Sequence, residues 1–331
     1  MKVRPRLIPL GLLLCVISCL LEQKAEFVEI DAPPLKVRSD QEPSPAGSAE
    51  FRAGQVAYKR KDYAAALPHF RAAAEAGEVA AMRRVGFMIM NGLGTSEPKM
   101  NAEGWFRKAA QAGDHSSEFN LALLYYVHAK PRDCDASVSW LKKASAEVPQ
   151  AGFELGQLYI TGDCVPKDRA KSAAWRHRAA QLGHVESQLL LSLMYARGDG
   201  GLPRDYVKQI MWVTKAAEQG DPEALHILGV AYSQAGRGVT VDYARGNKLL
   251  HQAQAKGNRC AALYLSAKYY EGGKGVPRDR AKAKQLLETA VKTPKEKEVV
   301  RKMDFSERGY MSKNHIDFFV ESFNCSAAFG K

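Results

Sequence analysis

The chain has 331 residues, 46% of them hydrophobic and 25% charged, which is the balance of a globular protein and excludes a collagen-like or wholly disordered chain. At this length we expect two domains or one elongated array. The formal net charge of +12 is spread along the sequence and is not gathered in a dense basic cluster. This distribution favours an acidic partner by electrostatic steering and gives no footprint for nucleic acid.

Residues 1–19 have the form of an export signal. Basic residues within the first six positions precede an apolar run of 15 residues from Leu7 to Leu21. A membrane-spanning helix needs about 20 apolar residues, which makes a permanent anchor the weaker interpretation. Ser18 directly before Cys19 resembles a bacterial lipobox. We therefore expect a lipoprotein signal with lipidation of Cys19, a periplasmic location, and membrane contact only through the lipid; export with ordinary cleavage is the alternative.

Two segments separate this signal from the body of the chain. Residues 20–48 are charged and rich in Pro and Ser, without a sustained apolar period, which predicts a flexible tether that reaches roughly 30 Å. Residues 49–61 are expected to form an N-capping helix. The tether would hold the folded body clear of a lipid surface.

Four cysteines follow the expected signal: Cys134, Cys164, Cys260 and Cys325. An even count suits two disulfides in an oxidising compartment, and buried free thiols are the alternative. These cysteines form no CxxC pair and have no histidine at zinc-ligand spacing, so we expect no metal site.

The body of the chain is an internal repeat. The four tryptophans stand 35, 35 and 37 residues apart, and an alanine follows each by four positions, which predicts an amphipathic helix that a neighbour can approach closely. A small residue three positions before a tyrosine, as in Gly156 with Tyr159, indicates a second helix. A glycine-rich loop and an aspartate then follow, as in GDCVPKD ending at Asp168. They indicate a helix end and the cap of the next helix.

A period of about 36 residues with two helices per unit predicts an all-α, right-handed solenoid of about six helix-turn-helix repeats. We place the repeats at residues 62–294, between capping segments at 49–61 and 295–331. The motif W-x-x-KAA-x-x-G, followed by L-G-x-x-Y and G-x-G-V-x-x-D, resembles the Sel1-like repeat, a relative of the tetratricopeptide repeat. The resemblance is strongest from Ala170 to Asp279 and weaker where HAKPRDC, ending at Cys134, replaces the glycine loop.

Stacking of such repeats implies how the cysteines pair. Cys134 ends one repeat and Cys164 lies in the corresponding loop of the next, so we expect these two to be joined. Cys260 opens the second helix of the last repeat. Cys325 lies in a tail with a helical apolar period, which would fold back, cap the array and form the second disulfide.

Catalytic motifs are absent from the sequence or lack their partners. The glycine loops recur once per repeat and match no phosphate-binding motif. Two Ser-x-x-Lys strings, Ser96 with Lys99 and Ser139 with Lys142, lack the Lys-Thr-Gly and Ser-Asp-Asn elements of penicillin-binding enzymes, a class to which some Sel1-like relatives have been compared. We therefore expect no enzyme activity, no catalytic residue and no cofactor.

Recognition of another protein is the remaining role. The resemblance implies a concave groove formed by the first helix of each repeat, which we take to be the tryptophan helix, and a convex ridge formed by the second. Candidate partner-binding positions in that groove change chemically between repeats: Arg107, Lys142, Arg176, His177, Lys215 and His251. Their positive charge suits an acidic protein, and a solvated helix face is the alternative interpretation.

Exported Sel1-like proteins are similar to the periplasmic immunity proteins that Gram-negative bacteria direct against phospholipase effectors of the type VI secretion system. This resemblance implies that the array binds such an effector and occludes it. An envelope assembly scaffold for polysaccharide export, secretion or a motor complex would have the same features and is the alternative. A penicillin-binding or cell-wall enzyme is the third hypothesis.

Overall fold

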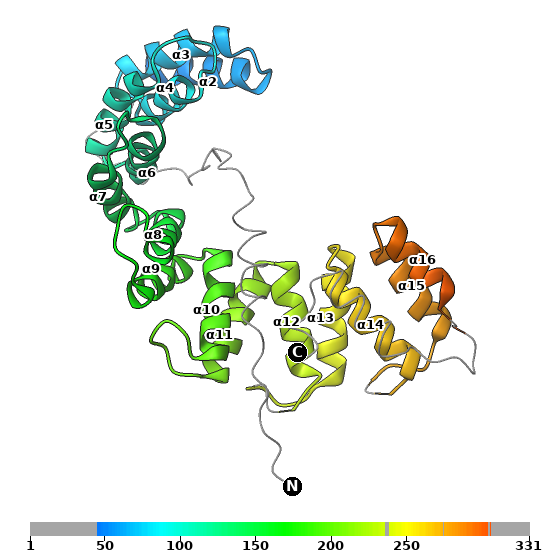
Figure 1. Ribbon diagram of the computed structural model, residues 1–331. Helices are drawn as coiled ribbons and strands as arrows, with labels where there is room; N and C mark the ends of the chain where they lie inside the picture. Colours follow the sequence, from blue (N-terminus) through cyan, green and yellow to red (C-terminus); the bar gives the residue numbers. More distant parts are fainter. Residues whose placement is uncertain (1–44, 236–237, 274, 304, 306–331) are drawn as a thin grey trace. The chain divides into compact units, whose positions relative to one another are not determined.

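The computed structural model describes residues 45–235, 238–273, 275–303 and 305 (Figure 1). The expected signal, the lipidation site Cys19, the tether up to residue 44 and the tail that contains Cys325 lie outside the described residues. Of the described residues, 45–256 form one compact unit and those from 257 onward belong to another. We call them the N-terminal unit and the C-terminal unit and describe each by itself.

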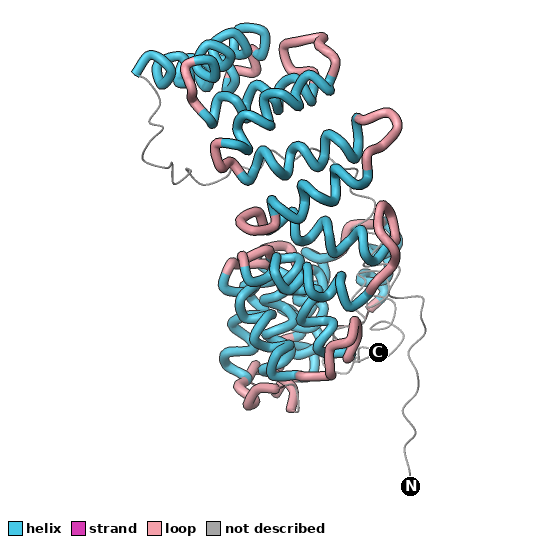
Figure 2. The backbone as a smooth tube through the Cα atoms, turned by 90° about the vertical axis from the view of Figure 1, so that its left-hand side faces the viewer, coloured by secondary structure: helices cyan, strands magenta, loops and turns pink. Residues whose placement is uncertain are grey.

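The N-terminal unit consists of twelve helices joined by short loops (Figure 2). They are α2 (Pro45–Lys59), α3 (Tyr63–Glu75), α4 (Val79–Asn91), α5 (Ala102–Gln111), α6 (His115–Leu123), α7 (Cys134–Ala144), α8 (Pro149–Thr161), α9 (Arg169–Gln181), α10 (Val185–Arg197), α11 (Tyr206–Glu218), α12 (Pro222–Tyr232) and α13 (Tyr243–Ala255). A 3-10 turn, η2 (Lys99–Asn101), precedes α5, and a π-helical turn, η3 (Leu124–His128), extends α6. No strand lies among the described residues of this unit.

The aspartate after each glycine loop fixes the start of the next helix and its position against the preceding one. Asp168 accepts a hydrogen bond from the backbone N–H of Lys171 at 2.9 Å and so caps α9. The N–H of Asp168 donates to the carbonyl of Tyr159 in α8, also at 2.9 Å. Asp242 and Tyr232 repeat this bond at 2.9 Å between α13 and α12. The tyrosine and aspartate motifs of the sequence therefore meet in each such loop.

The small residues of the repeat lie where helices approach most closely. A Cβ atom added to Gly86 would lie 2.7 Å from the Phe106 ring, and one added to Gly229 would lie 2.8 Å from Leu250. The alanines four positions after the tryptophans are all buried: Ala109, Ala144, Ala179 and Ala216. Of the tryptophans, Trp212 is buried and the other three are partly exposed, so they flank the core.

The helices pair differently from the sequence-based expectation. α8 packs more extensively on α9 than α9 packs on α10, and the same preference holds along the N-terminal unit. The hairpins α6–α7, α8–α9 and α10–α11 therefore consist of a tyrosine helix followed by a tryptophan helix, whereas the expected repeat began with the tryptophan helix. The reason is that the glycine loop and the bond from Asp168 to Tyr159 lie within the hairpin and hold its two helices together.

This pairing also changes the role expected for the first helix. α2 packs on α3 as the first helix of a hairpin, and Gly54 of α2 approaches Phe70 of α3 so closely that a Cβ atom would lie 2.8 Å from the ring. α2 begins at Pro45, inside the segment expected to be tether, and ends at Lys59. The expected capping helix over 49–61 is therefore part of the repeat array.

The even- and odd-numbered helices lie on opposite sides of the array. In Figure 1, α2 to α9 follow an arc with α4, α6 and α8 on its inner side and α5 and α7 on its outer side. α4 also contacts α6 directly. Bulky rings separate the outer helices, as where His177 of α9 meets Trp212 of α11 with ring centroids 5.3 Å apart. The tryptophan helices, which were expected to form the groove, therefore form the outer side.

The C-terminal unit has three described helices, α14 (Arg259–Glu271), α15 (Arg280–Ala290) and α16 (Pro294–Lys302). Thr293 and Glu296 form a capping box at the start of α16. Glu296 also pairs with Arg259 of α14 at 2.7 Å. Buried residues of all three helices share one cluster, which includes Cys260, Leu263, Leu287 and Val300. The first part of the expected C-terminal capping segment is thus a helix packed on the hairpin formed by α14 and α15.

Candidate protein-binding surfaces

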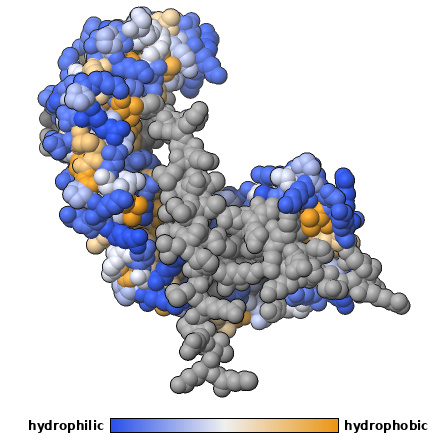
Figure 3. Space-filling model, in the orientation of Figure 1, coloured by the Kyte–Doolittle hydropathy of each residue, from blue (hydrophilic) through white to orange (hydrophobic). Residues whose placement is uncertain are grey.

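The inner side of the N-terminal unit carries partly exposed apolar side chains. In Figure 3, hydrophobic residues form patches among hydrophilic ones on the segment from α2 to α9. The partly exposed apolar residues of the inner helices α6, α8 and α10 include Leu123, Phe153, Ile160, Leu189 and Leu193. The even-numbered helices α2 to α12 contain five basic and five acidic residues. The inner helices are therefore electrically balanced and present apolar contact area.

A row of polar groups connects α8 to α10 on this side. The Nε2 of His184 donates to Oε1 of Gln150 at 2.7 Å, and Nε2 of Gln150 donates to Oε1 of Glu154 at 2.7 Å. The Nδ1 of His184 accepts the N–H of Ser187 at 3.2 Å and so caps α10. Both ring nitrogens are thus occupied in the neutral imidazole.

Burial shifts two pKa values within this row. It lowers the pKa of His184, partly offset by the charge of Glu186, so the imidazole stays neutral over a wider pH range. Burial also raises the pKa of Glu154, partly offset by the hydrogen bond from Gln150. Phe153 packs against His184 with ring centroids 4.8 Å apart, which places an aromatic face beside these polar groups.

The outer side is strongly basic. The odd-numbered helices α3 to α13 contain thirteen Lys and Arg residues but only four Asp and Glu residues. Many of these cations lie against aromatic rings of the repeat, as Lys215 does over Trp212 at 4.8 Å and Lys208 over Tyr195 at 5.3 Å. Positive charge is therefore concentrated on one side of the N-terminal unit, a segregation that the overall net charge does not reveal.

The six predicted partner-binding residues all lie on the outer helices, away from the inner groove in which they were expected. Arg107, Lys142 and Lys215 are exposed on α5, α7 and α11. Arg107 lies 5.6 Å from the centre of the Trp140 ring, which places it beside the helix that carries Lys142. His177 and His251 are partly exposed on α9 and α13. An acidic partner would therefore meet these residues on the outer side.

Arg176, the sixth of these residues, is buried and holds two helices together. Its side chain is 8% exposed and packs on Gly156, where a Cβ atom would lie 2.9 Å from Cγ of Arg176. Its Nη2 donates to Oε1 of Gln157. Burial lowers the pKa of Arg176 to about 10. This position joins α9 to α8 and offers a partner little surface.

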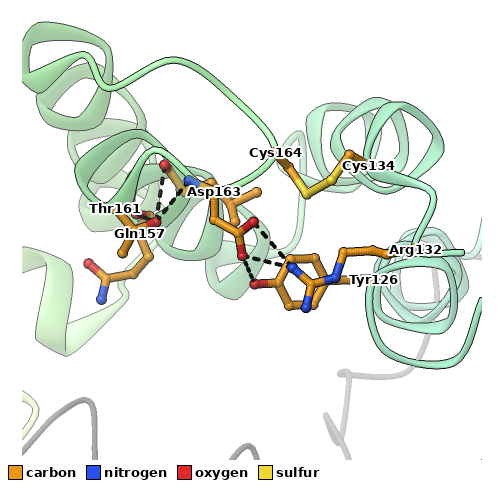
Figure 4. Close-up of polar contacts among 8 residues, drawn as sticks. Tyr126, Arg132, Cys134, Gln157, Thr161, Asp163 and Cys164 are labelled. Carbon is orange, nitrogen blue, oxygen red and sulfur yellow. Dashed lines mark hydrogen bonds and ion pairs between the residues drawn. A yellow bond between two sulfur atoms is a disulfide. The ribbon is translucent and has the colours of Figure 1, made fainter.

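A disulfide joins Cys134 at the start of α7 to Cys164 in the loop after α8 (Figure 4). The two Cα atoms lie 5.0 Å apart, and the bond links two successive hairpins. This is the pair that stacking of the repeats predicted. Cys260 in the C-terminal unit is also disulfide-bonded, and its predicted partner Cys325 lies outside the described residues.

Polar contacts reinforce the same junction. The Tyr126 hydroxyl donates to Oδ2 of Asp163, and Arg132 pairs with that carboxylate at 3.0 Å (Figure 4). The Arg132 guanidinium also lies 4.2 Å from the centre of the Tyr126 ring. Burial and the bond to Asp163 raise the pKa of Tyr126. We call these three residues and the disulfide the clasp.

Tyr126, Arg132 and Asp163 belong to no motif that marks them in the sequence. The available signal was that HAKPRDC replaces the glycine loop. This departure marked the junction as different but did not identify the residues that form it. Asp163 and the two clasp cysteines also form a group with metal-ligand spacing among the described residues. Both sulfur atoms are committed to the disulfide, so the group offers no thiolate to a metal.

The Ser-x-x-Lys strings fall on unrelated parts of the array. Ser139 and Lys142 are both exposed on the outer helix α7, while Ser96 and Lys99 lie around η2, in the connection between α4 and α5. None of the described helices is both long enough and apolar enough to cross a membrane.

Stacked antiparallel helix pairs make this chain an all-α solenoid. A family model described as the Sel1 repeat matches seven successive segments: residues 49–78, 79–114, 115–147, 149–184, 185–221, 222–258 and 260–292. The chain therefore belongs to the Sel1 repeat family, a class of protein-binding scaffolds. The matched units begin with the tyrosine helix, as the packing does, and number seven where the sequence suggested about six.

One similar curated protein is the chitin synthase regulator SKT5 of Saccharomyces cerevisiae, which is 30% identical over 141 residues. The match covers 39% of this chain and 20% of SKT5, so the chain spans about a fifth of that relative.

Solved structures with this fold include a Sel1 repeat protein from Oxalobacter formigenes, with 30% identity and a TM-score of 0.57 over 72% of this chain and 98% of that one. A protective antigen with an SLR fold, present in uropathogenic Escherichia coli strains, has 26% identity and a TM-score of 0.54. The match covers 86% of this chain and 69% of the antigen. The fold likeness to an immunity protein from Pseudomonas aeruginosa is weaker, with 18% identity and a TM-score of 0.41 over 68% and 88%.

Proposed function

We propose that this chain is an exported, non-catalytic repeat protein that binds a phospholipase effector of type VI secretion in the periplasm and occludes it. The observation that carries the proposal is the apolar inner side of α6, α8 and α10, with Leu123, Phe153, Ile160, Leu189 and Leu193 partly exposed. Phospholipases admit acyl chains through an apolar entrance, and ligand sites of this kind are concave and lined by hydrophobic residues. A curved apolar surface that covers such an entrance would block access without any chemistry.

The location rests on separate observations. The lipoprotein-type signal with Cys19 predicts delivery to the envelope, and the clasp disulfide suits an oxidising compartment. The similarity to a protective antigen of Escherichia coli also supports a place in the envelope, because an antigen must be accessible to the host. Lipidation at Cys19 would then keep the chain at the membrane where a phospholipase acts.

The test is a titration of the purified chain into a purified type VI phospholipase effector from the same organism, with lipid hydrolysis as the readout. The expected result is stoichiometric loss of hydrolysis. Binding is then measured by calorimetry without lipid for Leu193→Asp on α10 and for Val207→Asp on α11. Because a charge placed in an apolar contact must lose its water, the inner variant should weaken binding by about tenfold or more, whereas the outer control should not.

Two results would overturn the proposal. Binding that leaves hydrolysis intact would remove occlusion as the mechanism, and equal effects of the two variants would remove the inner side as the contact surface. Capture of secretion, polysaccharide export or motor components from the envelope, with no hydrolase among them, would instead identify an assembly scaffold.

A further inference from the structure

The outer side of the N-terminal unit combines positive charge with exposed apolar side chains. On α11, Val207 is 69% exposed and Met211 is 43% exposed. Lys208 and Lys215 are exposed on the same helix. These four residues are related by spacings of three and four, which places them on one stripe of the helix.

Neighbouring outer helices extend this stripe. Lys171 and Arg178 of α9 stand 37 residues before Lys208 and Lys215 and are also exposed. The ring contact between His177 and Trp212 makes α9 and α11 direct neighbours. α9 and α13 contain no acidic residue, and α11 between them contains one, Glu218 at its last position. The basic stripe is therefore continuous from one outer helix to the next.

The aromatic residues beneath the stripe hold its charges at the surface. The ammonium group of Lys208 lies over the Tyr195 ring and that of Lys215 over the Trp212 ring, at 5.3 and 4.8 Å. A ring positions a cation without neutralising it. The capping aspartates pair with two of the cations, Asp205 with Lys208 at 3.5 Å and Asp168 with Lys171 at 3.4 Å, and both lysines are exposed. Val207 and Met211 stand beside these cations, and neither side chain is buried within the unit.

We propose that this basic outer face, defined by Lys171, Arg178, Val207, Lys208, Met211 and Lys215, binds the surface of an anionic phospholipid bilayer. Basic residues attract the headgroups, while the two apolar side chains reach the boundary between headgroups and acyl chains, as in other interfacial proteins. The inner side would then point away from the lipid and remain open to a protein partner. This contact does not depend on the proposed effector and adds to any lipid anchor.

The test is co-sedimentation of the full chain with vesicles. Cys19→Ser is included so that no acyl chain contributes. Vesicles of phosphatidylcholine mixed with phosphatidylglycerol in equal parts are compared with phosphatidylcholine alone. Because each basic residue near such a surface contributes about fivefold to partitioning, we expect clear binding to the mixed vesicles that weakens as salt is raised.

Paired variants locate the contact. Lys208→Gln with Lys215→Gln should lower partitioning into the mixed vesicles by about twentyfold. Arg52→Gln with Lys59→Gln removes two exposed charges from α2 and should leave partitioning within about twofold of the parent. Val207→Ser with Met211→Gln should mainly reduce the binding that survives high salt, because that part is apolar.

The proposal is wrong if the chain binds both kinds of vesicle equally, or if the two charge-removing variants behave alike. It is also wrong if neither vesicle is bound while the α11 charges are needed for an acidic protein partner, which would make the outer side a protein-binding surface. Circular dichroism of every variant checks that the helices are intact.

Discussion

The loop after α6 and the loop after α10 join the two helices of their hairpins in different ways. The loop after α10 contains three glycines with positive φ, at 198, 200 and 201, and Asp205 bonds to the Tyr195 carbonyl at 2.8 Å. The loop after α6 contains no glycine, and the matching bond from Asp133 to Tyr125 is longer, at 3.3 Å. The clasp lies at the loop after α6. A covalent bond and an ion pair thus tie the loop without glycine to the corresponding loop of the next hairpin.

The largest expected effect comes from opening the clasp. Cys134→Ser with Cys164→Ser removes a bond that closes 30 residues of chain, which should lower the free energy of unfolding by about 3.5 kcal/mol on the chain-entropy estimate. Urea unfolding followed by circular dichroism measures the change. Asp163→Asn, which weakens only the polar part of the clasp, should cost about 1 kcal/mol or less. Equal stability of the parent and the double variant would show that the glycine-free loop needs no covalent support.

The next largest effects are expected from replacing two helix glycines with alanine, and they should have opposite signs. Gly229→Ala places a methyl group 2.8 Å from Leu250 and 3.0 Å from the carbonyl oxygen of Gly246, so α12 and α13 must separate, at a cost of about 1 to 3 kcal/mol. Gly104→Ala in α5 meets no atom within 4 Å and should stabilise the chain by about 0.5 to 1 kcal/mol. Thermal unfolding of both variants checks the opposite signs. The same sign for both would contradict close helix approach at Gly229.

A smaller effect concerns the partly buried Glu154. Burial raises its pKa, so the ionised form is less favourable in the folded chain and stability falls as the pH rises through the folded pKa. Glu154→Gln keeps an oxygen that can accept the bond from Gln150 and should therefore be more stable than the parent at neutral pH. Below the ordinary pKa of glutamate the difference should vanish. Urea unfolding at neutral pH and at a pH below the ordinary glutamate pKa measures this difference in stability. A variant more stable than the parent at the acidic pH would contradict this explanation.

The smallest expected effect is the pH response of His184. Its pKa is lowered in the folded chain, so stability is complete above the ordinary histidine pKa of about 6.5 and falls as the pH drops below it. His184→Asn retains a side chain suited to cap α10 but cannot titrate. The slope of stability against pH between about 7 and 5 should therefore be flatter for the variant. An unchanged slope would show that His184 contributes nothing to it.

The sequence was most informative where one residue type has one structural use. Asp168 and Asp242 were expected to cap helices and do so, because an aspartate after a glycine loop has backbone N–H groups within reach. The pairing of Cys134 with Cys164 followed from the stacking of equivalent loops. Arg176 was misjudged because a charged residue beside the packing frame looks exposed in a sequence, while its long side chain can lie along the small residue Gly156.

The sequence by itself determined the all-α class, the repeat period and the positions of helix starts and ends, because these depend on local spacing and capping. Only the tertiary structure decided which neighbours form a hairpin and which side of the array is inner. In a stack of antiparallel helices every helix has two neighbours, and periodicity treats them alike. The choice depends on contacts that the period does not show: small residues such as Gly229 let the two helices of a hairpin approach, and rings such as Trp212 lie between the outer helices of successive hairpins. For the same reason, only the structure placed the basic residues together on the outer side.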